Sequence, residues 1–413
     1  MDYSSLSKDL TNKLPSAVKK ENGIYFTPPS CITNNINLLK PYMSEIKSVL
    51  EPSCGSGEFI TSLQSQFPNT ISITGIELND TIYNSILHLA EGSTSKGSNV
   101  KIIKQDYLNY SPVAKFDLII GNPPFYVMKK DMVDEVYYPY FVGRPNIFIL
   151  FIIKSLELLN DNGILSFILP KNFLNCLYYD KTRKFICDNF QILHIIECHD
   201  KFLETQQETI MFIVRKTIGL KIDNTKFALP IDKYTVFVLD INMAGIIKLY
   251  EKSKTLFELG FTVSVGTVVW NQCKEILTDN ATETRLIYCS DIVDNKLSIK
   301  KYKSNEKKNY IAKPGLTHPM IVINRGYGVG EYKFNYCLID TSSEYLIENH
   351  LICIEFNKEN IGSVKKDELI KMYNKVIKSL NDKRTQEFIN LYFGNNAINT
   401  TELNYILPIY YDI

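Results

Sequence analysis

The chain has 413 residues, of which 45% are hydrophobic and 22% charged, enough to form the cores of roughly two or three folded domains. The net charge of +1 excludes a protein that binds nucleic acid through a global positive field, so that any such contact must come from local patches. No apolar run reaches the roughly 18 residues of a membrane helix, and nine cysteines without a C-x-x-C pair indicate a reducing compartment with neither a zinc site nor a disulfide framework.

The first motif is Gly23–Pro29, which follows about twenty polar residues. Thr27 precedes two prolines, an order that predicts a helix capped by Thr27 and continuing through Cys31–Leu39. A simple cap is one interpretation of this motif. The alternative is that the start of the helix covers the charged end of a ligand.

A glycine-rich turn comes next. A predicted strand ends near Leu50, the turn contains Gly55 and Gly57, and a helix is predicted from about Glu58. The two glycines allow the backbone to approach a ligand closely. The third glycine of the dinucleotide-binding motif is absent. Because the carboxylates of Glu51 and Glu58 flank the turn and repel phosphate, we expect a cationic ligand.

The next two predicted strands also lead to acidic residues. The strand Ile71–Leu78 carries Glu77 at its end, where an acidic side chain commonly binds a ribose diol. The strand Val100–Ile103 is followed by Asp106 and Tyr107. Acidic residues at the ends of successive strands fit a ligand that carries adenine, ribose and a positive charge. S-adenosylmethionine has all three.

The stretch Phe116–Phe125 contains the most specific motif of the chain. An apolar run over Leu118–Ile120 predicts a buried strand, and the stiff turn Asn122-Pro123-Pro124-Phe125 follows it. This turn offers hydrogen-bond acceptors and an aromatic ring that can stack, but no strong base and no nucleophile. A substrate with an exocyclic amino group on an aromatic ring fits it, and a plain turn at the end of a strand is the alternative.

The rest of the first half continues to alternate between strand and helix. The predicted elements are a helix from Pro145 to Leu159, a turn at Asp161–Gly163, a strand over Ile164–Leu169, a helix over Phe173–Asn189, and strands over Ile192–Glu197 and Thr209–Arg215. This alternation predicts an α/β fold with a doubly wound, mostly parallel sheet.

From about Lys216 the strand–helix units give way to short mixed segments. Lys296–Lys313 contains seven lysines and one acidic residue, and Arg325–Gly330 is a flexible basic loop with a tyrosine. Either segment alone is usually a solvated surface. Together they indicate contact with phosphates and with the nucleic-acid backbone. We therefore predict two domains, at residues 1–220 and 236–413, with a mixed α+β fold in the second.

These motifs together resemble the gamma-class DNA adenine-N6 methyltransferases, the TaqI-like enzymes of type II restriction–modification systems. The matching stretches are, in chain order, GIYFTPP, LEPSCGSGEF, GIEL, KQDYL, FDLIIGNPPF and NIFILFIIKSLELLNDNGILSFILP. The resemblance covers about residues 20–216 and extends to the second half only in plan and in loose fragments such as VSVGTVVWNQCK. Phe125 departs from the family, in which tyrosine is the commonest residue at this position; the stacking ring is kept and the hydroxyl is lost.

The resemblance implies the sheet of S-adenosylmethionine-dependent methyltransferases, with S-adenosyl-L-methionine as the cofactor and no metal. The residues implied to bind the cofactor are Thr27 at its methionine end, Glu51, Cys54 and Gly55 along the turn, Glu77 at the ribose hydroxyls, Asp106 at the adenine amino group, Tyr107 beside the adenine ring, and Asn122.

The resemblance also implies how the target base is held. Asn122 and the carbonyl of Pro123 accept hydrogen bonds from the target amino group, and Phe125 stacks on the base after it has been flipped out of the duplex. Phe202 is implied as a second aromatic partner, and an ordinary core phenylalanine is the alternative at that position.

The implied activity is site-specific transfer of a methyl group from S-adenosylmethionine to the N6 amino group of a flipped-out adenine in duplex DNA. The residues expected to contact DNA in the target-recognition domain are Lys300, Lys301 and Arg325. Two alternatives stay open: another amino-methyltransferase, acting on cytosine N4, an RNA adenine or a protein glutamine, and an inactive methyltransferase fold that binds nucleic acid or a partner. The expected partners are double-stranded DNA and a cognate restriction endonuclease, with no membrane. The chain is expected to be a monomer in the cytoplasm of a bacterium or of the host of a large DNA virus.

Overall fold

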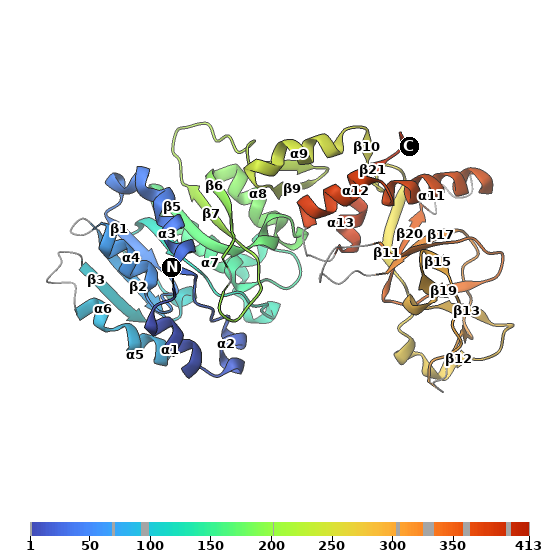
Figure 1. Cartoon of the computed structure of the whole chain (residues 1–413), viewed down its shortest axis with the longest axis horizontal. Helices are drawn as coiled ribbons and strands as arrows, with labels where there is room; N and C mark the ends of the chain where they lie inside the picture. Colours follow the sequence, from blue (N-terminus) through green and yellow to red (C-terminus); the bar gives the residue numbers. More distant parts are fainter. Residues whose placement is uncertain are drawn as a thin grey trace. The chain divides into compact units, whose positions relative to one another are not determined.

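The computed structural model describes residues 2–67, 71–91, 99–200, 202–302, 306–324, 334–357, 364–393 and 398–412. The chain divides into two compact units, Met1–Met243 and Ala244–Ile413, which are described separately (Figure 1).

The first unit is built on a seven-stranded sheet with the strand order β3-β2-β1-β4-β5-β7-β6. Its strands are β1 (Ser48–Glu51), β2 (Ser72–Glu77), β3 (Asn99–Lys104), β4 (Phe116–Gly121), β5 (Leu159–Pro170), β6 (Gln191–Cys198) and β7 (Thr209–Arg215). The first five are parallel, and β7 runs antiparallel to both β5 and β6. This confirms the predicted doubly wound, mostly parallel sheet. The strand order reverses between β1 and β4, and ligands of such sheets bind at the carboxyl ends of the strands beside this reversal.

Helices cover both faces of this sheet. They are α1 (Ser5–Lys13), α2 (Ser16–Asn22), α3 (Pro29–Leu39), α4 (Glu58–Gln66), α5 (Asp80–Ile86), α6 (His88–Glu91), α7 (Ile147–Glu157) and α8 (Asp180–Asn189).

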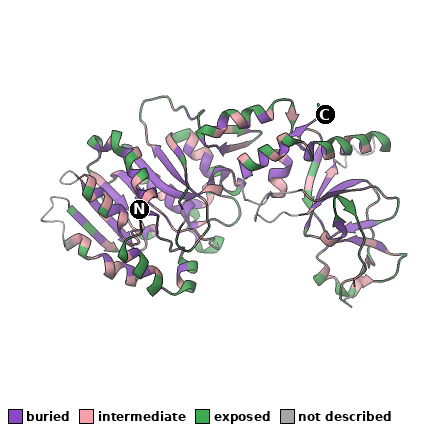
Figure 2. Cartoon of the chain, viewed as in Figure 1, coloured by how far each residue is buried: buried purple, intermediate pink, exposed green. Residues whose placement is uncertain are grey.

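The apolar run of β4 contributes to two hydrophobic cores. Leu118 and Ile120 belong to the cluster that includes α3 and α4, whereas Ile119 belongs to the cluster that includes α7 and α8. Successive side chains of a strand point to opposite faces of the sheet, so a strand covered on both faces has no polar position in its middle. Figure 2 shows the sheet buried along most of its central strands.

Two helical predictions in the first unit were wrong in detail. Pro28, and not Thr27, is the N-cap residue of α3, which has no side-chain cap. The predicted helix Phe173–Asn189 is α-helical only from Asp180. The buried guanidinium of Arg183 donates to the carbonyls of Phe173 (2.9 Å) and Cys176 (2.8 Å). These two hydrogen bonds hold the segment before α8 in two short 3-10 turns.

The strand predicted at Ile164–Leu169 is longer in the structure. β5 begins at Leu159, which pairs with Phe116 of β4, and the predicted turn at Asp161–Gly163 therefore lies within the strand. The same pairing explains why α7 ends at Glu157, before the predicted helix end at Leu159.

The first unit extends beyond residue 220, where the sequence placed its end. The hairpin of β8 (Ala228–Ile231) and β9 (Tyr234–Phe237) is attached to it, because Thr235 donates its N–H to Asp180 (2.7 Å) and accepts from Arg183 (2.6 Å). Phe237 also lies in the core cluster of α7 and α8.

The second unit consists of short strands and helices, which gives it a mixed α+β character. A four-stranded sheet has the order β11-β20-β17-β18 and another the order β12-β16-β13-β19. The strands are β10 (Ser253–Lys254), β11 (Phe261–Val265), β12 (Leu277–Thr278), β13 (Thr284–Ile287), β14 (Ile292–Val293), β15 (Lys296–Leu297), β16 (Tyr310–Ile311), β17 (Met320–Asn324), β18 (Tyr336–Ile339), β19 (Tyr345–Ile347), β20 (Leu351–Phe356) and β21 (Ile409–Tyr410). The helices are α9 (Asp240–Tyr250), which crosses the boundary between the units, α11 (Lys366–Leu380), α12 (Lys383–Phe388) and α13 (Thr400–Tyr405). Among the described residues, no helix of either unit combines the length and the apolar character needed to cross a membrane.

Candidate active site

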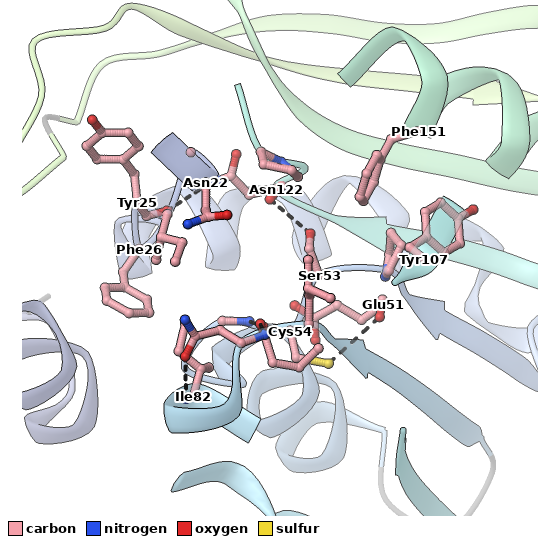
Figure 3. Close-up of a pocket in the computed structure, with 18 of the residues that line it drawn as sticks. Asn22, Tyr25, Phe26, Glu51, Ser53, Cys54, Ile82, Tyr107, Asn122 and Phe151 are labelled. Atoms are coloured by element: carbon pink, nitrogen blue, oxygen red, sulfur yellow. Dashed lines mark hydrogen bonds between the residues drawn. The ribbon is translucent and has the colours of Figure 1, made fainter. Parts of the chain in front are cut away.

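A cavity of about 390 Å³ lies at the carboxyl ends of β1, β2, β3 and β4, beside the reversal of strand order (Figure 3). Its walls come from the segments that follow these strands and from one segment before α3. The lining residues are 22–27, 51–56, 58, 59, 77–80, 105–108, 122, 124, 126 and 128, together with Ile32, Ile82, Ile147 and Phe151. The volume is within the roughly 300–1,000 Å³ that small-molecule sites occupy.

The glycine turn after β1 is fixed to the end of β2. Cys54 donates its N–H to the carbonyl of Ile76 (2.9 Å), and Gly55 donates to the carboxylate of Glu77 (3.0 Å). Gly57 is the N-cap residue of α4 and has φ 74°, in the left-handed region that glycine adopts without strain. The turn therefore has one defined path along the cavity.

Glu77 is buried but is held by backbone donors. One carboxylate oxygen accepts from Asn79 N–H (2.7 Å) and the other from Gly55 N–H (3.0 Å). Burial raises the pKa of the Glu77 carboxyl, while these two N–H groups oppose the rise. A carboxylate offers about four acceptor sites, so the Glu77 carboxylate keeps acceptor capacity for a ligand hydroxyl beside its backbone donors.

Glu51 is the second buried carboxyl of the cavity and is only 2% exposed. Its Oε2 has no hydrogen-bond partner among the described residues. Burial raises the pKa of this carboxyl well above its usual range, and the charges of Glu77 and Glu58 add to the rise. A buried carboxyl oxygen without a partner is costly. A bound cation removes this cost, so the site favours a positively charged ligand.

Asp106 and Tyr107 form the wall after β3. Asp106 accepts from the N–H of Leu108 (2.9 Å) and from the side chain of Asn109 (3.2 Å), which fixes its carboxylate. The hydroxyl of Tyr107 contacts the hydroxyl of Ser155 (2.8 Å) in the core, and its ring centroid lies 4.8 Å from that of Phe151. The hydroxyl of Tyr107 therefore already has a hydrogen-bond partner inside the protein, and only the aromatic ring is available to a ligand in the cavity.

The amide of Asn122 lies between Tyr25 and Ser53 (Figure 3). Its Nδ2 donates to the carbonyl of Tyr25 (3.1 Å), and its backbone carbonyl accepts from the hydroxyl of Ser53 (3.1 Å). Its Oδ1 is buried and has no hydrogen-bond partner among the described residues. Asn122 lines the cavity, and its side chain keeps an acceptor that no described residue uses.

Most residues predicted from the sequence meet in this cavity. Those that line it are Thr27, Glu51, Cys54, Gly55, Glu77, Asp106, Tyr107, Asn122 and Pro124. Pro123 and Phe125 do not line it. Pro123 is buried, and the half-buried ring of Phe125 packs edge-on against Phe148, with ring centroids 6.0 Å apart.

Phe202 is not brought to the cavity. It is 5% exposed and belongs to the hydrophobic cluster of α3 and α4, together with Cys31, Ile168 and Met211. This is the ordinary core position that the sequence left open as the alternative for this residue.

The lysine-rich stretch of the second unit is less uniform than predicted. Lys300 and Lys301 are exposed. The ammonium of Lys307, by contrast, lies 4.0 Å from the centre of the Tyr288 ring, and Lys308 forms an ion pair with Asp279 (2.5 Å). Lys307 and Lys308 are therefore engaged within the protein. Arg325, and with it the predicted loop Arg325–Gly330, lies outside the described residues.

Sequence reasoning missed Gly23, the carbonyl of Tyr25, and Tyr126 and Phe151 as parts of the site. The residue type of Gly23 is a signal that the sequence contains, because a glycine in the left-handed conformation commonly ends a helix. In the structure Gly23 follows α2 with φ 63°. No residue pattern predicts a role for the backbone carbonyl of Tyr25, since every residue carries this group.

Comparison with known proteins extends these observations. Residues 32–202 match the family model described as "Eco57I restriction-modification methylase". Over 404 residues, and 96% of both chains, the protein is 27% identical to the type II methyltransferase M.CvrRI of Paramecium bursaria Chlorella virus XZ-6E. It is 26% identical over 405 residues, again 96% of both chains, to the modification methylase CviBIII of Paramecium bursaria Chlorella virus NC1A.

A solved structure supports the fold across both units. A cryo-EM structure of a DrdV–DNA complex aligns with a TM-score of 0.53 at 12% identity, covering 95% of this chain and 57% of that chain. The comparisons confirm a resemblance to type II restriction–modification methyltransferases, and this resemblance implies S-adenosylmethionine as the cofactor. The cavity fits this group, because it combines a buried carboxyl with one oxygen unpartnered among the described residues, a backbone-held carboxylate and an aromatic wall.

Proposed function

We infer that this chain, a methyltransferase of the type II restriction–modification kind that uses S-adenosylmethionine, methylates the N6 amino group of an adenine flipped out of duplex DNA. The observation that carries this inference is the Asn122 amide. Its Oδ1 is buried without a partner among the described residues, and its Nδ2 is fixed to the Tyr25 carbonyl at 3.1 Å. The site thus offers an acceptor to an amino group, and the loop Asn122–Phe125 itself holds no side chain suited to act as a nucleophile.

The amino nitrogen of adenine is a poor nucleophile, because its lone pair is delocalised into the ring. Asn122 Oδ1 and the carbonyl of Pro123 accept hydrogen bonds from the two N–H groups of the amino group. This favours a more tetrahedral nitrogen, whose lone pair is then available for attack. When bound, S-adenosylmethionine supplies the sulfonium methyl group for one in-line displacement. The protein promotes this step by placement and by fixed dipoles, and no base has to remove a proton beforehand.

Five residues divide the binding of the cofactor among them. Glu77 accepts from the ribose hydroxyls, Asp106 from the adenine amino group, and the ring of Tyr107 flanks the adenine. The carboxyl of Glu51 balances the positive charge of the methionine end, beside Thr27. The support for this division is that all five residues line one cavity, with Glu51 and Glu77 at the ends of β1 and β2 and Asp106 following β3.

Base flipping accounts for the aromatic residue of the loop. A target base inside the duplex is out of reach, so it must leave the stack. The ring of Phe125 is expected to stack on the flipped base and to return part of the unstacking cost, since such contacts contribute roughly 1–3 kcal/mol. The edge-on contact with Phe148 holds one side of this ring and supports a fixed orientation.

The second unit is proposed to read the DNA sequence. A catalytic site that accepts any flipped adenine cannot select the surrounding bases, and direct readout takes place in the grooves. Lys300 and Lys301 are proposed to contact phosphates, and Arg325 to approach bases or backbone. We also propose that the substrate is double-stranded DNA and that a cognate restriction endonuclease is the functional partner. The chain is proposed to act as a monomer.

The test is methyl transfer with the full chain. Purified protein and methyl-labelled S-adenosylmethionine are incubated with duplex DNA and, in a parallel reaction, with RNA, and the nucleic acid is digested to nucleosides for chromatography. N6-methyldeoxyadenosine is the expected product. N4-methyldeoxycytidine would favour the cytosine enzymes, and labelling of RNA alone would favour an RNA substrate. Cofactor binding without transfer to any nucleic acid would favour an inactive binding module.

A further inference from the structure

We propose that the segment Gly23–Phe26 positions the catalytic amide, with the Tyr25 carbonyl setting which end of Asn122 faces the target and Gly23 permitting the approach. This rests on the proposed function, because Asn122 has a reaction to perform only if the site methylates an amino group. Neither Gly23 nor Tyr25 is proposed to act on the substrate chemically. Both act through Asn122.

The need for positioning comes from the amide itself. A rotation of about 180° exchanges the oxygen and the NH₂ group of an asparagine at almost no change in shape. Only the oxygen can accept from the target amino group, whereas the NH₂ group would meet it donor to donor. The orientation of Asn122 must therefore be set by a partner outside the substrate.

Tyr25 supplies that partner through its backbone. Its carbonyl accepts from Asn122 Nδ2 at 3.1 Å, while Oδ1 stays without a partner among the described residues. Turning the amide over would set Oδ1 against the Tyr25 carbonyl, acceptor to acceptor. Losing a buried hydrogen bond in this way corresponds to a preference of roughly tenfold or more for the observed orientation.

Gly23 explains how the Tyr25 carbonyl reaches this place. Gly23 ends α2 in the left-handed conformation, with φ 63°. A Cβ added there would lie 2.7 Å from the backbone nitrogen of Phe125 and 3.0 Å from Cβ of Pro124. The segment therefore packs directly on the backbone of the catalytic loop, and a side chain at this position would push the two apart.

The N-terminal side of this contact is anchored. Lys19, in the last turn of α2, is 5% exposed. Its ammonium donates to the carbonyl of Thr11 (2.6 Å) and pairs with Glu204 (2.5 Å), and its own carbonyl accepts from Ile24 N–H (2.9 Å). Because α2 is held in this way, a side chain at Gly23 is expected to move the catalytic loop or the Tyr25 carbonyl and not the helix.

Three variants of the full chain distinguish the effect of a steric contact at Gly23 from the effect of backbone strain. Gly23→Ala adds a Cβ against Phe125. Gly23→Asn adds the same Cβ but tolerates the left-handed conformation better than alanine does. Gly219→Ala is the matched control, because Gly219 also has a positive φ (70°) but has no atom within 4 Å of its Cβ position. Each variant is measured for thermal unfolding, for the S-adenosylmethionine dissociation constant and for single-turnover methyl transfer to duplex DNA.

Both Gly23 variants are expected to lower the single-turnover rate at least about tenfold, with a dissociation constant close to that of the unaltered chain. Gly219→Ala is expected to keep both quantities. Recovery of the rate in Gly23→Asn would show that strain and not contact decides, and would overturn the proposal. Loss of cofactor binding in step with the rate, or an unchanged rate in Gly23→Ala, would also overturn it. Failure of the proposed function is distinguishable, because the unaltered chain would then yield no N6-methyldeoxyadenosine from duplex DNA.

Discussion

Replacing Glu51 by glutamine tests how the cavity holds the positive charge of its cofactor. The substitution keeps the shape of the side chain and removes its acidity. Glu51 is 2% exposed and has an unpartnered Oε2, and burial, followed by the charges of Glu77 and Glu58, raises its pKa. In the free protein this carboxyl therefore keeps its proton to a higher pH than an ordinary glutamate. A cationic ligand favours the ionised form, so cofactor binding is expected to release a proton.

The expected loss follows from the interaction that glutamine cannot make. A hydrogen bond to a charged group contributes about 1.5–3 kcal/mol. Glu51→Gln should therefore raise the dissociation constant of S-adenosylmethionine roughly 10- to 100-fold. In the unaltered chain, affinity should increase with pH until Glu51 is ionised without the ligand. This slope should disappear in Glu51→Gln.

The same substitution has the opposite effect on stability. An acid whose pKa is raised by folding binds more protons in the folded than in the unfolded state. Its contribution is complete below the usual pKa of glutamate and is lost as the pH rises through the folded-state value. The ligand-free Glu51→Gln protein should therefore unfold at a higher temperature than the unaltered chain above that value, while binding the cofactor more weakly.

Titration calorimetry over a pH series provides the assay, in two buffers with different ionisation enthalpies that reveal the protons released. The exposed Glu135→Gln variant is the control and should change neither affinity nor slope. An unchanged dissociation constant in Glu51→Gln, with the same proton release, would refute the assignment of Glu51 to the positive charge.

Other predictions concern the catalytic loop and the second unit. Asn122→Ala should bind S-adenosylmethionine normally and lose methyl transfer, and near-native turnover would contradict the role of the amide. Phe125→Tyr should be nearly neutral and Phe125→Ala harmful, as followed by the fluorescence of 2-aminopurine at the target base; equal rates would remove the ring from the site. Replacing Lys300 and Lys301 by glutamine should weaken binding to all duplexes alike and reduce the salt slope by about 1–2. Lys308→Gln should leave the slope unchanged, because Lys308 already pairs with Asp279, and an altered sequence preference at constant slope would contradict this assignment.

Residue patterns along the chain were sufficient to predict the local parts of the site. The apolar side chains of β4 point to both faces of the sheet. Their continuous run was therefore recognisable as a buried strand without knowledge of the elements packed against it. The glycines after β1 and the prolines after β4 identify their turns, because the conformations they allow are properties of single residues. Parallel strands bring their carboxyl ends to one edge, so Glu51, Glu77 and Asp106 were expected to meet, and they line one cavity.

Which polar and charged groups are available to a ligand, and which already have partners in the protein, depends on tertiary contacts. Asn122 is paired with a carbonyl 97 residues away in the sequence, and that contact determines which end of the amide is available. Phe202 lies in the core, and Lys308 is paired with Asp279, although each was a reasonable ligand contact by residue type. The physical reason is that residue type sets what a side chain can do, whereas burial and partners distant in the chain set whether its hydrogen bonds and charge are still available to a ligand.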